Sequence, residues 1–172
     1  METNTSQQEP AMTPETPQGE HHWLQQLVGE WTYESEADMG PDQPPAKATG
    51  TENVRSLGRL WTLAEGEGEM PGCGTAKTLM TLGYDSQKQR YVGTWIGSMM
   101  SYLWRYDGEL DAAKKVLTLE SEGPDMVVEG KMAKYRDVIE FKGSNHRVMT
   151  SYVLADDGHW QLFMTANYHR KQ

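Results

Sequence analysis

Residues 22–31 read HWLQQLVGEW, and this stretch indicates how the chain folds. Its apolar residues recur at the spacing of one helix face: Trp23, Leu24, Leu27 and Val28. We therefore predict one or two helical turns over residues 22–28, ended by Gly29. From Trp31 onward the pattern alternates, with Glu34 and Glu36 on the face opposite Trp31. Because the charged face must meet water, Trp31 is predicted to point inward from a strand.

The rest of the chain is divided by turn signals such as Asp107-Gly108 and Asp157-Gly158. Between them we predict ten strands, at residues 30–38, 47–56, 60–67, 75–84, 89–97, 100–107, 115–121, 126–139, 146–155 and 159–170. Short antiparallel strands with short turns form a meander, and closure into a barrel removes the free edges of a meander. We therefore predict an all-β fold, an up-and-down antiparallel barrel with a short N-terminal helix. A two-sheet sandwich is the alternative.

The last predicted strand also has two distinct faces. One is mostly apolar and consists of Trp160, Leu162, Met164, Ala166, Tyr168 and Arg170. The other consists of Gln161, Phe163, Thr165, Asn167 and His169. The apolar face is predicted to lie inside the barrel, which places Arg170 on the same side of the sheet as Trp31.

A short helix followed by Gly29-Glu30-Trp31 resembles the G-x-W start of the calycin superfamily, which includes the lipocalins and fatty-acid-binding proteins. This resemblance implies that Trp31 lies at the closed end of the barrel, with Arg170 packed across it. The segments LGYD (82–85), RYVGTW (90–95) and LWRYDG (103–108) resemble an uncharacterised bacterial calycin-like family, a domain of unknown function. The number of strands is closer to fatty-acid-binding proteins and nitrobindins than to lipocalins.

Composition limits the partners of the chain. Its 172 residues carry a net charge of −9 with no cluster of basic residues, which argues against nucleic acid and against anionic membranes as partners. Residues 1–20 are polar and proline-containing and are expected to form a disordered tail, and residues 21–172 one barrel domain. A single cysteine, Cys73, and the lack of an apolar leader predict a cytoplasmic protein.

If Trp31 and Arg170 mark the closed end, successive hairpins alternate between the two ends of the barrel. The loops assigned to the open end then carry five methionines: Met39, Met70, Met99, Met100 and Met126. The same loops carry prolines, including Pro71 and Pro124. Methionine is flexible and is common at adaptable binding surfaces. We therefore predict that these methionines form a portal, with the filling of loop gaps as the alternative.

Aromatic residues of the strands are candidates for the wall of a cavity. The predicted ligand-binding set is Tyr33, Trp95, Tyr102, Trp104, Tyr152, Trp160 and Met164. Trp61 belongs to the same group of strand aromatics, but its face also carries Glu65 and Glu67. A barrel with this many strands is wider than side chains alone usually fill. The leading hypothesis is therefore the binding of a small hydrophobic or amphipathic molecule inside the barrel, with a packed core as the alternative.

Two other functions stay open. One is a cavity-based isomerase or lyase that uses Glu65, His146 or a tyrosine, or a haem-binding barrel, because nitrobindin-like barrels bind haem through a histidine. The other is a filled barrel that acts as an oligomerisation module, with a homodimer as the assembly to test. Glu65, Glu67 and Glu69 share one strand face and are expected to be solvated. No cofactor and no metal site are predicted, and Cys73 is expected to be inert.

Overall fold

The computed structural model describes residues 12–70 and 72–172, so the predictions for residues 1–11 and for Pro71 lie outside the described residues. The helical segment consists of α1 (Gly19–Leu24) and a 3-10 turn, η1 (Gln25–Leu27). The strands are β1 (Gly29–Ala37), β2 (Ala46–Leu57), β3 (Trp61–Met70), β4 (Gly74–Asp85), β5 (Arg90–Gly97), β6 (Trp104–Leu110), β7 (Val116–Pro124), β8 (Met132–Gly143), β9 (His146–Leu154) and β10 (Trp160–Arg170). None of the helices in the described ranges is long and apolar enough to cross a membrane.

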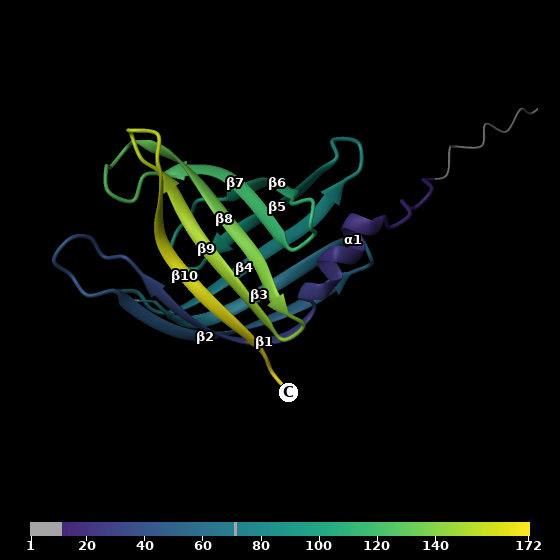
Figure 1. Ribbon diagram of the computed structural model, residues 1–172, viewed down its shortest axis with the longest axis horizontal. Helices are drawn as coiled ribbons and strands as arrows, with labels where there is room; N and C mark the ends of the chain where they lie inside the picture. The colour runs from purple at the N-terminus through teal and green to yellow at the C-terminus, as the bar shows by residue number, and fades with distance from the viewer. Residues whose placement is uncertain (1–11, 71) are drawn as a thin grey trace, which may run out of the picture.

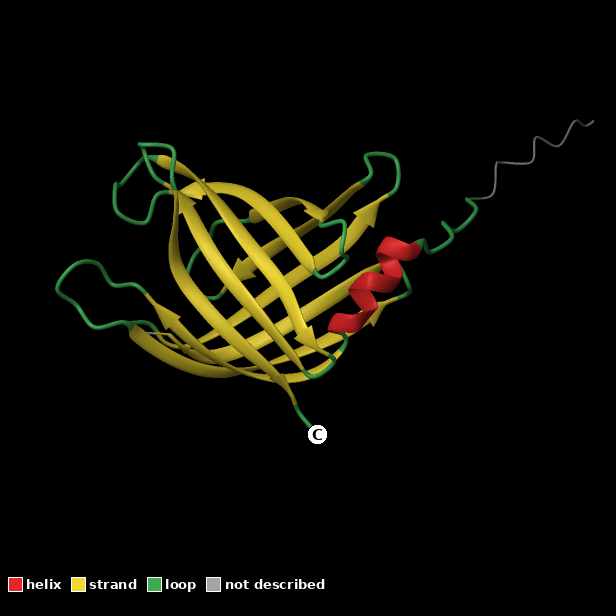
Figure 2. Cartoon of the chain, in the orientation of Figure 1, coloured by secondary structure: helices red, strands yellow, loops and turns green. Residues whose placement is uncertain are grey.

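The ten strands of the described residues form one closed antiparallel barrel in the order β1-β10-β9-β8-β7-β6-β5-β4-β3-β2. Each strand pairs with its neighbours in the sequence, and β1 pairs with β10 to close the barrel. The helix α1 covers one end, while the loops β1–β2, β7–β8 and β9–β10 lie at the other (Figures 1 and 2). The predicted fold class is confirmed, and the sandwich alternative is wrong.

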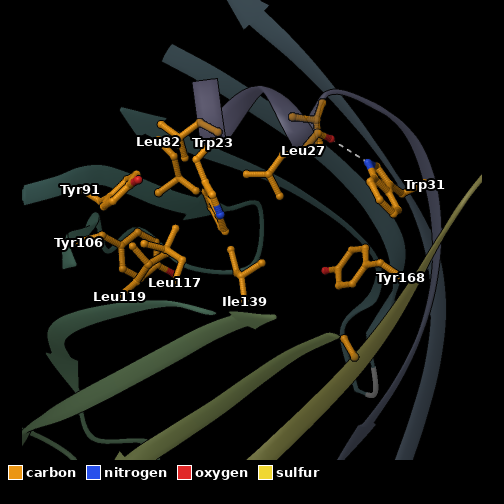
Figure 3. Packing of buried hydrophobic residues seen from close by; sticks show 13 residues of the cluster. Trp23, Leu27, Trp31, Leu82, Tyr91, Tyr106, Leu117, Leu119, Ile139 and Tyr168 are labelled. Carbon is orange, nitrogen blue, oxygen red and sulfur yellow. Dashed lines mark hydrogen bonds between the residues drawn. The ribbon is translucent and has the colours of Figure 1, made fainter. Parts of the chain in front are cut away.

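Trp31 and Arg170 lie together at the covered end. Trp31 is fully buried, and its Nε1 donates a hydrogen bond of 2.8 Å to the carbonyl oxygen of Leu27 (Figure 3). The guanidinium of Arg170 lies 4.2 Å from the centroid of the Trp31 ring and donates to the carbonyl oxygens of Val28 (2.6 Å) and Gln26 (2.9 Å). These contacts join the end of the helical segment to the last strand.

Large side chains fill one part of the interior, next to β5–β8. Members of this cluster include Trp23, Tyr91, Tyr106, Leu117, Leu119 and Ile139 (Figure 3). Trp23 packs edge-to-face against Phe141, with ring centroids 5.5 Å apart, and against Tyr91, with centroids 6.0 Å apart. This part of the barrel is a solid core, and the open space lies beside the other strands.

Two strands begin several residues later than predicted. β6 begins at Trp104 instead of residue 100, and β8 begins at Met132 instead of residue 126. The side chain of Asp125 accepts hydrogen bonds from the backbone N–H groups of Val127 (2.8 Å) and Val128 (2.9 Å). This Asx turn keeps residues 125–131 in a loop although Val127 and Val128 have a high preference for strands.

Candidate functional site

A cavity of about 690 Å³ lies inside the barrel. Its walls come from β1–β5 and β8–β10, and no described residue of β6 or β7 lines it. Leu27 of η1 lies at the covered end, whereas Met39, Gly40, Met126 and Val127 belong to loops at the opposite end. The cavity therefore has a floor beside the helical segment and a mouth among the loops.

Small side chains explain why the space lies beside β1–β3. The inward positions of these strands include Ala37, Ala46, Ala48, Gly50, Ala64, Gly66 and Gly68. Across the barrel, the inward positions of β6–β8 carry Tyr106, Leu117, Leu119 and Tyr135, which pack as a core. Tyr33 leans over Gly50 and Gly68, where a Cβ atom at either position would overlap its ring. The division between small and large residues sets the position of the cavity.

The floor carries a buried ion pair between Glu52 on β2 and Arg147 on β9. Arg147 is 3 % exposed, and its Nη2 atom donates to the Oε1 atom of Glu52. The guanidinium lies between two aromatic rings, 3.9 Å from the centroid of Tyr168 and 4.7 Å from that of Trp31. Its Nε atom has no hydrogen-bond partner in the described part of the chain. A charged, incompletely paired group therefore lies at the bottom of an otherwise largely apolar cavity.

Two tyrosines of the wall lie beside this ion pair. The rings of Tyr33 and Tyr168 have centroids 5.2 Å apart, and the Tyr168 hydroxyl points toward the barrel interior (Figure 3). Burial raises the pKa of both hydroxyls, and the negative charge of Glu52 raises the pKa values further. Both groups therefore stay protonated at neutral pH and can donate hydrogen bonds at the floor.

A second carboxylate on an inward strand face lies outside the cavity lining. Asp137 on β8 accepts hydrogen bonds of 2.5 Å from the hydroxyls of Tyr106 and Ser151. Burial raises the pKa of Asp137, although these two hydrogen bonds favour its ionised form and oppose the shift. Asp137 is not among the residues that line the cavity, and we assign these hydrogen bonds to the packing of β6, β8 and β9.

The structure brings together only part of the predicted ligand-binding set. Tyr33, Trp95 and Met164 line the cavity. Trp104 packs instead in the filled part of the barrel, 5.0 Å from the ring of Tyr135, because β6 does not border the open space. Tyr102 precedes β6 and donates a 3.0 Å hydrogen bond to the carbonyl oxygen of Glu122. The expected positions of Tyr102 and Trp104 at the cavity wall are therefore incorrect.

Trp160 is misplaced for a different reason, a β-bulge in β10. The register with β9 shifts between Leu162 and Met164, so that Phe163 and Met164 both line the cavity. One extra residue in a strand exchanges the inward and outward positions of the residues that precede it. Trp160 therefore lies outside the cavity lining, under the guanidinium of Arg136 at 4.1 Å, and Phe163 lies inside. The prediction that one alternation runs through the whole strand is wrong.

Tyr152 also lies outside the cavity lining. The residues of β9 that line the cavity are Arg147, Met149 and Val153, so the inward positions are the odd-numbered ones. The two faces of β9 do not differ clearly in polarity, and the inward face contains the only charged side chain between residues 147 and 153. Polarity therefore pointed to the wrong face of this strand.

The predicted portal methionines fall into two groups. Met39, Met70 and Met126 line the mouth of the cavity. Met99 and Met100 belong to the β5–β6 loop and are not part of the lining. The Sδ atom of Met100 accepts a 3.2 Å hydrogen bond from the Nε1 atom of Trp104, and Met99 covers Gly97. These two methionines pack against neighbouring residues of the loop and strand.

Sequence reasoning missed three charged groups on inward strand faces, Glu52, Asp137 and Arg147. Each is a lone charged residue on a strand face whose other members are small, apolar or aromatic. Glu52 follows Ala46, Ala48 and Gly50 on its face, and Asp137 lies between Tyr135 and Ile139. An isolated charge on a buried face is the signal that identifies such a site, because it needs a partner from elsewhere in the fold.

The residues considered for catalysis or haem ligation lie elsewhere. Glu65 and Glu67 are exposed and pair with Arg55 (3.7 Å) and Lys77 (3.6 Å), respectively. His146 stacks on His169 outside the cavity, with ring centroids 4.5 Å apart. No described histidine lines the cavity, so the residues present do not fit a histidine-bound haem. The described residues contain no group of three potential metal ligands, and Cys73 is exposed.

A closed barrel of this topology, with Trp31 and Arg170 at its covered end, is a calycin-like fold. Residues 16–170 match the family described as a protein of unknown function, DUF1579, and the chain belongs to that family. This confirms the resemblance to an uncharacterised calycin-like family that the sequence indicated.

Solved structures share the fold at low sequence identity. The crystal structure of Rv2717c from M. tuberculosis superposes with a TM-score of 0.63 at 12% identity, covering 90% of this chain and 99% of that one. The S-type phycobiliprotein lyase CPES from Guillardia theta gives a TM-score of 0.55 at 12% identity, covering 91% and 99%. No curated protein matches the chain.

Proposed function

We propose that this protein binds a small, partly apolar molecule inside the barrel. The observation that carries the proposal is the cavity of about 690 Å³, whose walls are largely apolar and whose floor holds a few polar groups. Binding sites for small molecules have this volume and this combination of apolar walls with a few oriented polar groups. A solid interior, as the oligomerisation alternative requires, is at odds with this cavity.

The mouth has properties that suit the entry of such a molecule. Met126 is 63% exposed and Val127 is 91% exposed, yet both belong to the cavity lining. Their loop is held by Asp125, which also lies 3.7 Å from the ammonium group of Lys131. An apolar and adaptable rim lowers the cost of partial desolvation of a ligand on entry. Met39, Met70 and Met126 are therefore the proposed portal.

The proposal is tested with N-phenyl-1-naphthylamine, an uncharged dye whose fluorescence rises in apolar surroundings. Ala48→Trp places a large side chain in the cavity from an inward position of β2, and Thr49→Trp places the same side chain on the exposed outer face. The natural protein and the Thr49→Trp variant are expected to bind one dye per chain, and the Ala48→Trp variant to bind at least about tenfold more weakly. Equal binding by all three proteins, or no saturable binding, would contradict the proposal.

A further inference from the structure

The cavity floor holds one positive and one negative charge that neutralise each other. A guanidinium has five N–H donors, and a carboxylate has about four acceptor positions. The Glu52–Arg147 pair joins Nη2 to Oε1, and the Nε atom of Arg147 has no partner among the described residues. Both side chains belong to the cavity lining. The floor therefore has donor and acceptor capacity that the pair itself does not use.

The charges around the cavity disfavour an anionic ligand. Glu52 at the floor and Asp38 and Glu69 toward the mouth are acidic, and Arg147 is the single basic residue among the described residues of the lining. A carboxylate that binds to Arg147 would lie beside Glu52 and would leave the buried floor with an unbalanced negative charge. Such repulsion is weakly screened at a buried site.

The floor is equally unsuited to a ligand that carries a positive charge. An ammonium group that reached Glu52 would approach the guanidinium of Arg147, which is fixed between Trp31 and Tyr168. An uncharged group that has both a donor and an acceptor meets neither repulsion. It can accept from Arg147 or a tyrosine hydroxyl and donate to Glu52 at the same time.

We propose that the polar end of the bound molecule is an uncharged group that both donates and accepts hydrogen bonds, such as a carboxamide, held jointly by Arg147 and Glu52. This inference rests on the binding function proposed above. The apolar body of the molecule extends toward the mouth along Met80, Met149 and Met164. Tyr33 and Tyr168 supply further hydroxyl donors beside the ion pair.

The test compares three probes that share a ten-carbon chain and differ only at the polar end: decanamide, decanoate and decylamine. At pH 7.5 they are uncharged, negative and positive, respectively. Displacement of N-phenyl-1-naphthylamine by each probe gives its affinity. Decanamide is expected to bind the natural protein at least about tenfold more tightly than either charged probe. Equal or tighter binding of decanoate or decylamine overturns the inference.

The Glu52→Gln variant tests whether Glu52 is responsible for the preference for decanamide over decanoate. The substitution removes the negative charge and keeps the size of the side chain. Arg147 then has no compensating charge, so the preference for decanamide over decanoate is expected to fall at least about tenfold. Glu34→Gln removes the same charge from the exposed outer face of β1, outside the cavity lining, and is expected to change the preference less than about twofold. An unchanged preference in the Glu52→Gln variant, or an equal change in the Glu34→Gln variant, overturns the role of the floor.

The comparison of probes on the natural protein stands by itself if the Glu52→Gln variant does not fold. Failure of this inference is also distinguishable from failure of the binding function. If the dye binds but a charged probe is preferred, only the assignment of an uncharged polar end is overturned. If neither the dye nor any probe binds, both proposals are overturned.

Discussion

Glu52 and Arg147 form an ion pair inside the barrel although 95 residues separate them in the sequence. The pair joins β2 to β9 at the floor of the cavity, and the guanidinium is enclosed by Trp31 and Tyr168. Burial of two charges costs free energy of solvation, which the pair recovers only when both partners are present. The pair is therefore both a structural requirement and the most polar feature that a ligand meets.

The stability of the protein is expected to depend on both partners of this pair. Arg147→Met leaves Glu52 partly buried without a counter-charge and should lower the free energy of unfolding by ~3–5 kcal/mol. The double variant Glu52→Gln/Arg147→Met should recover a large part of that loss, because no isolated charge is left. Urea denaturation of the single and double variants measures the difference.

A matched control is the exposed pair between Lys47 and Glu36, whose side chains are 76% and 59% exposed. Lys47→Ala should cost less than about 1 kcal/mol. If Arg147→Met costs no more than Lys47→Ala, the buried pair does not stabilise the fold.

The closed end is expected to depend on Arg170. Its guanidinium packs on Trp31 and donates to three backbone carbonyl oxygens, those of Gln26, Val28 and Ser144. Arg170→Ala should therefore lower the free energy of unfolding by ~2–3 kcal/mol, and Arg170→Lys by less because the charge stays. Thermal or urea unfolding measures the effect, with Lys171→Ala as the neighbouring exposed control. Equal stability of the Arg170→Ala and Lys171→Ala variants would contradict the assignment.

The pH dependence of stability is expected to report on Asp137. Its pKa in the folded protein is raised above the ordinary value of 3.8 by burial. Between 3.8 and the raised value, the folded state binds more protons at this group than the unfolded chain does. The contribution of Asp137 to stability therefore falls as the pH rises through this window.

Asp137→Asn keeps the shape of the side chain and removes the titration. The stability of the natural protein relative to this variant should decrease as the pH is raised from 3.8 upward and level off above the folded pKa. Melting temperatures of both proteins in a pH series measure this difference. A difference that does not depend on pH, or that grows in favour of the natural protein as the pH rises, would show that the pKa is not raised.

Tryptophan fluorescence is expected to distinguish a tryptophan that lines the cavity from one that lies outside the lining. Trp95 lines the cavity, whereas Trp160 lies under Arg136 outside the lining. Trp95→Phe should remove most of the change in tryptophan emission that accompanies dye binding, and Trp160→Phe should leave that change intact. Titration of N-phenyl-1-naphthylamine into both variants measures this. A loss of the change in the Trp160→Phe variant would place Trp160 at the cavity after all.

Local sequence patterns were sufficient for the architecture. Turn signals separate ten alternating segments, which fold as the ten strands that the structure describes. In β1 the charged residues Glu34 and Glu36 lie opposite Trp31, and this contrast predicts the inward direction of the indole. These features depend on neighbours in the chain, so they can be recognised without knowledge of the fold.

Only the tertiary structure decided which side chains meet in the cavity. The bulge at Phe163 reverses the facing of Trp160 and brings Phe163 inside, although no residue type in the strand marks it. On β9 the charged residue Arg147 faces inward, because Glu52 on a distant strand compensates its charge. Alternation predicts which face of a strand points inward where the two faces differ in polarity. It carries no information about a bulge, or about a partner that long-range pairing brings close.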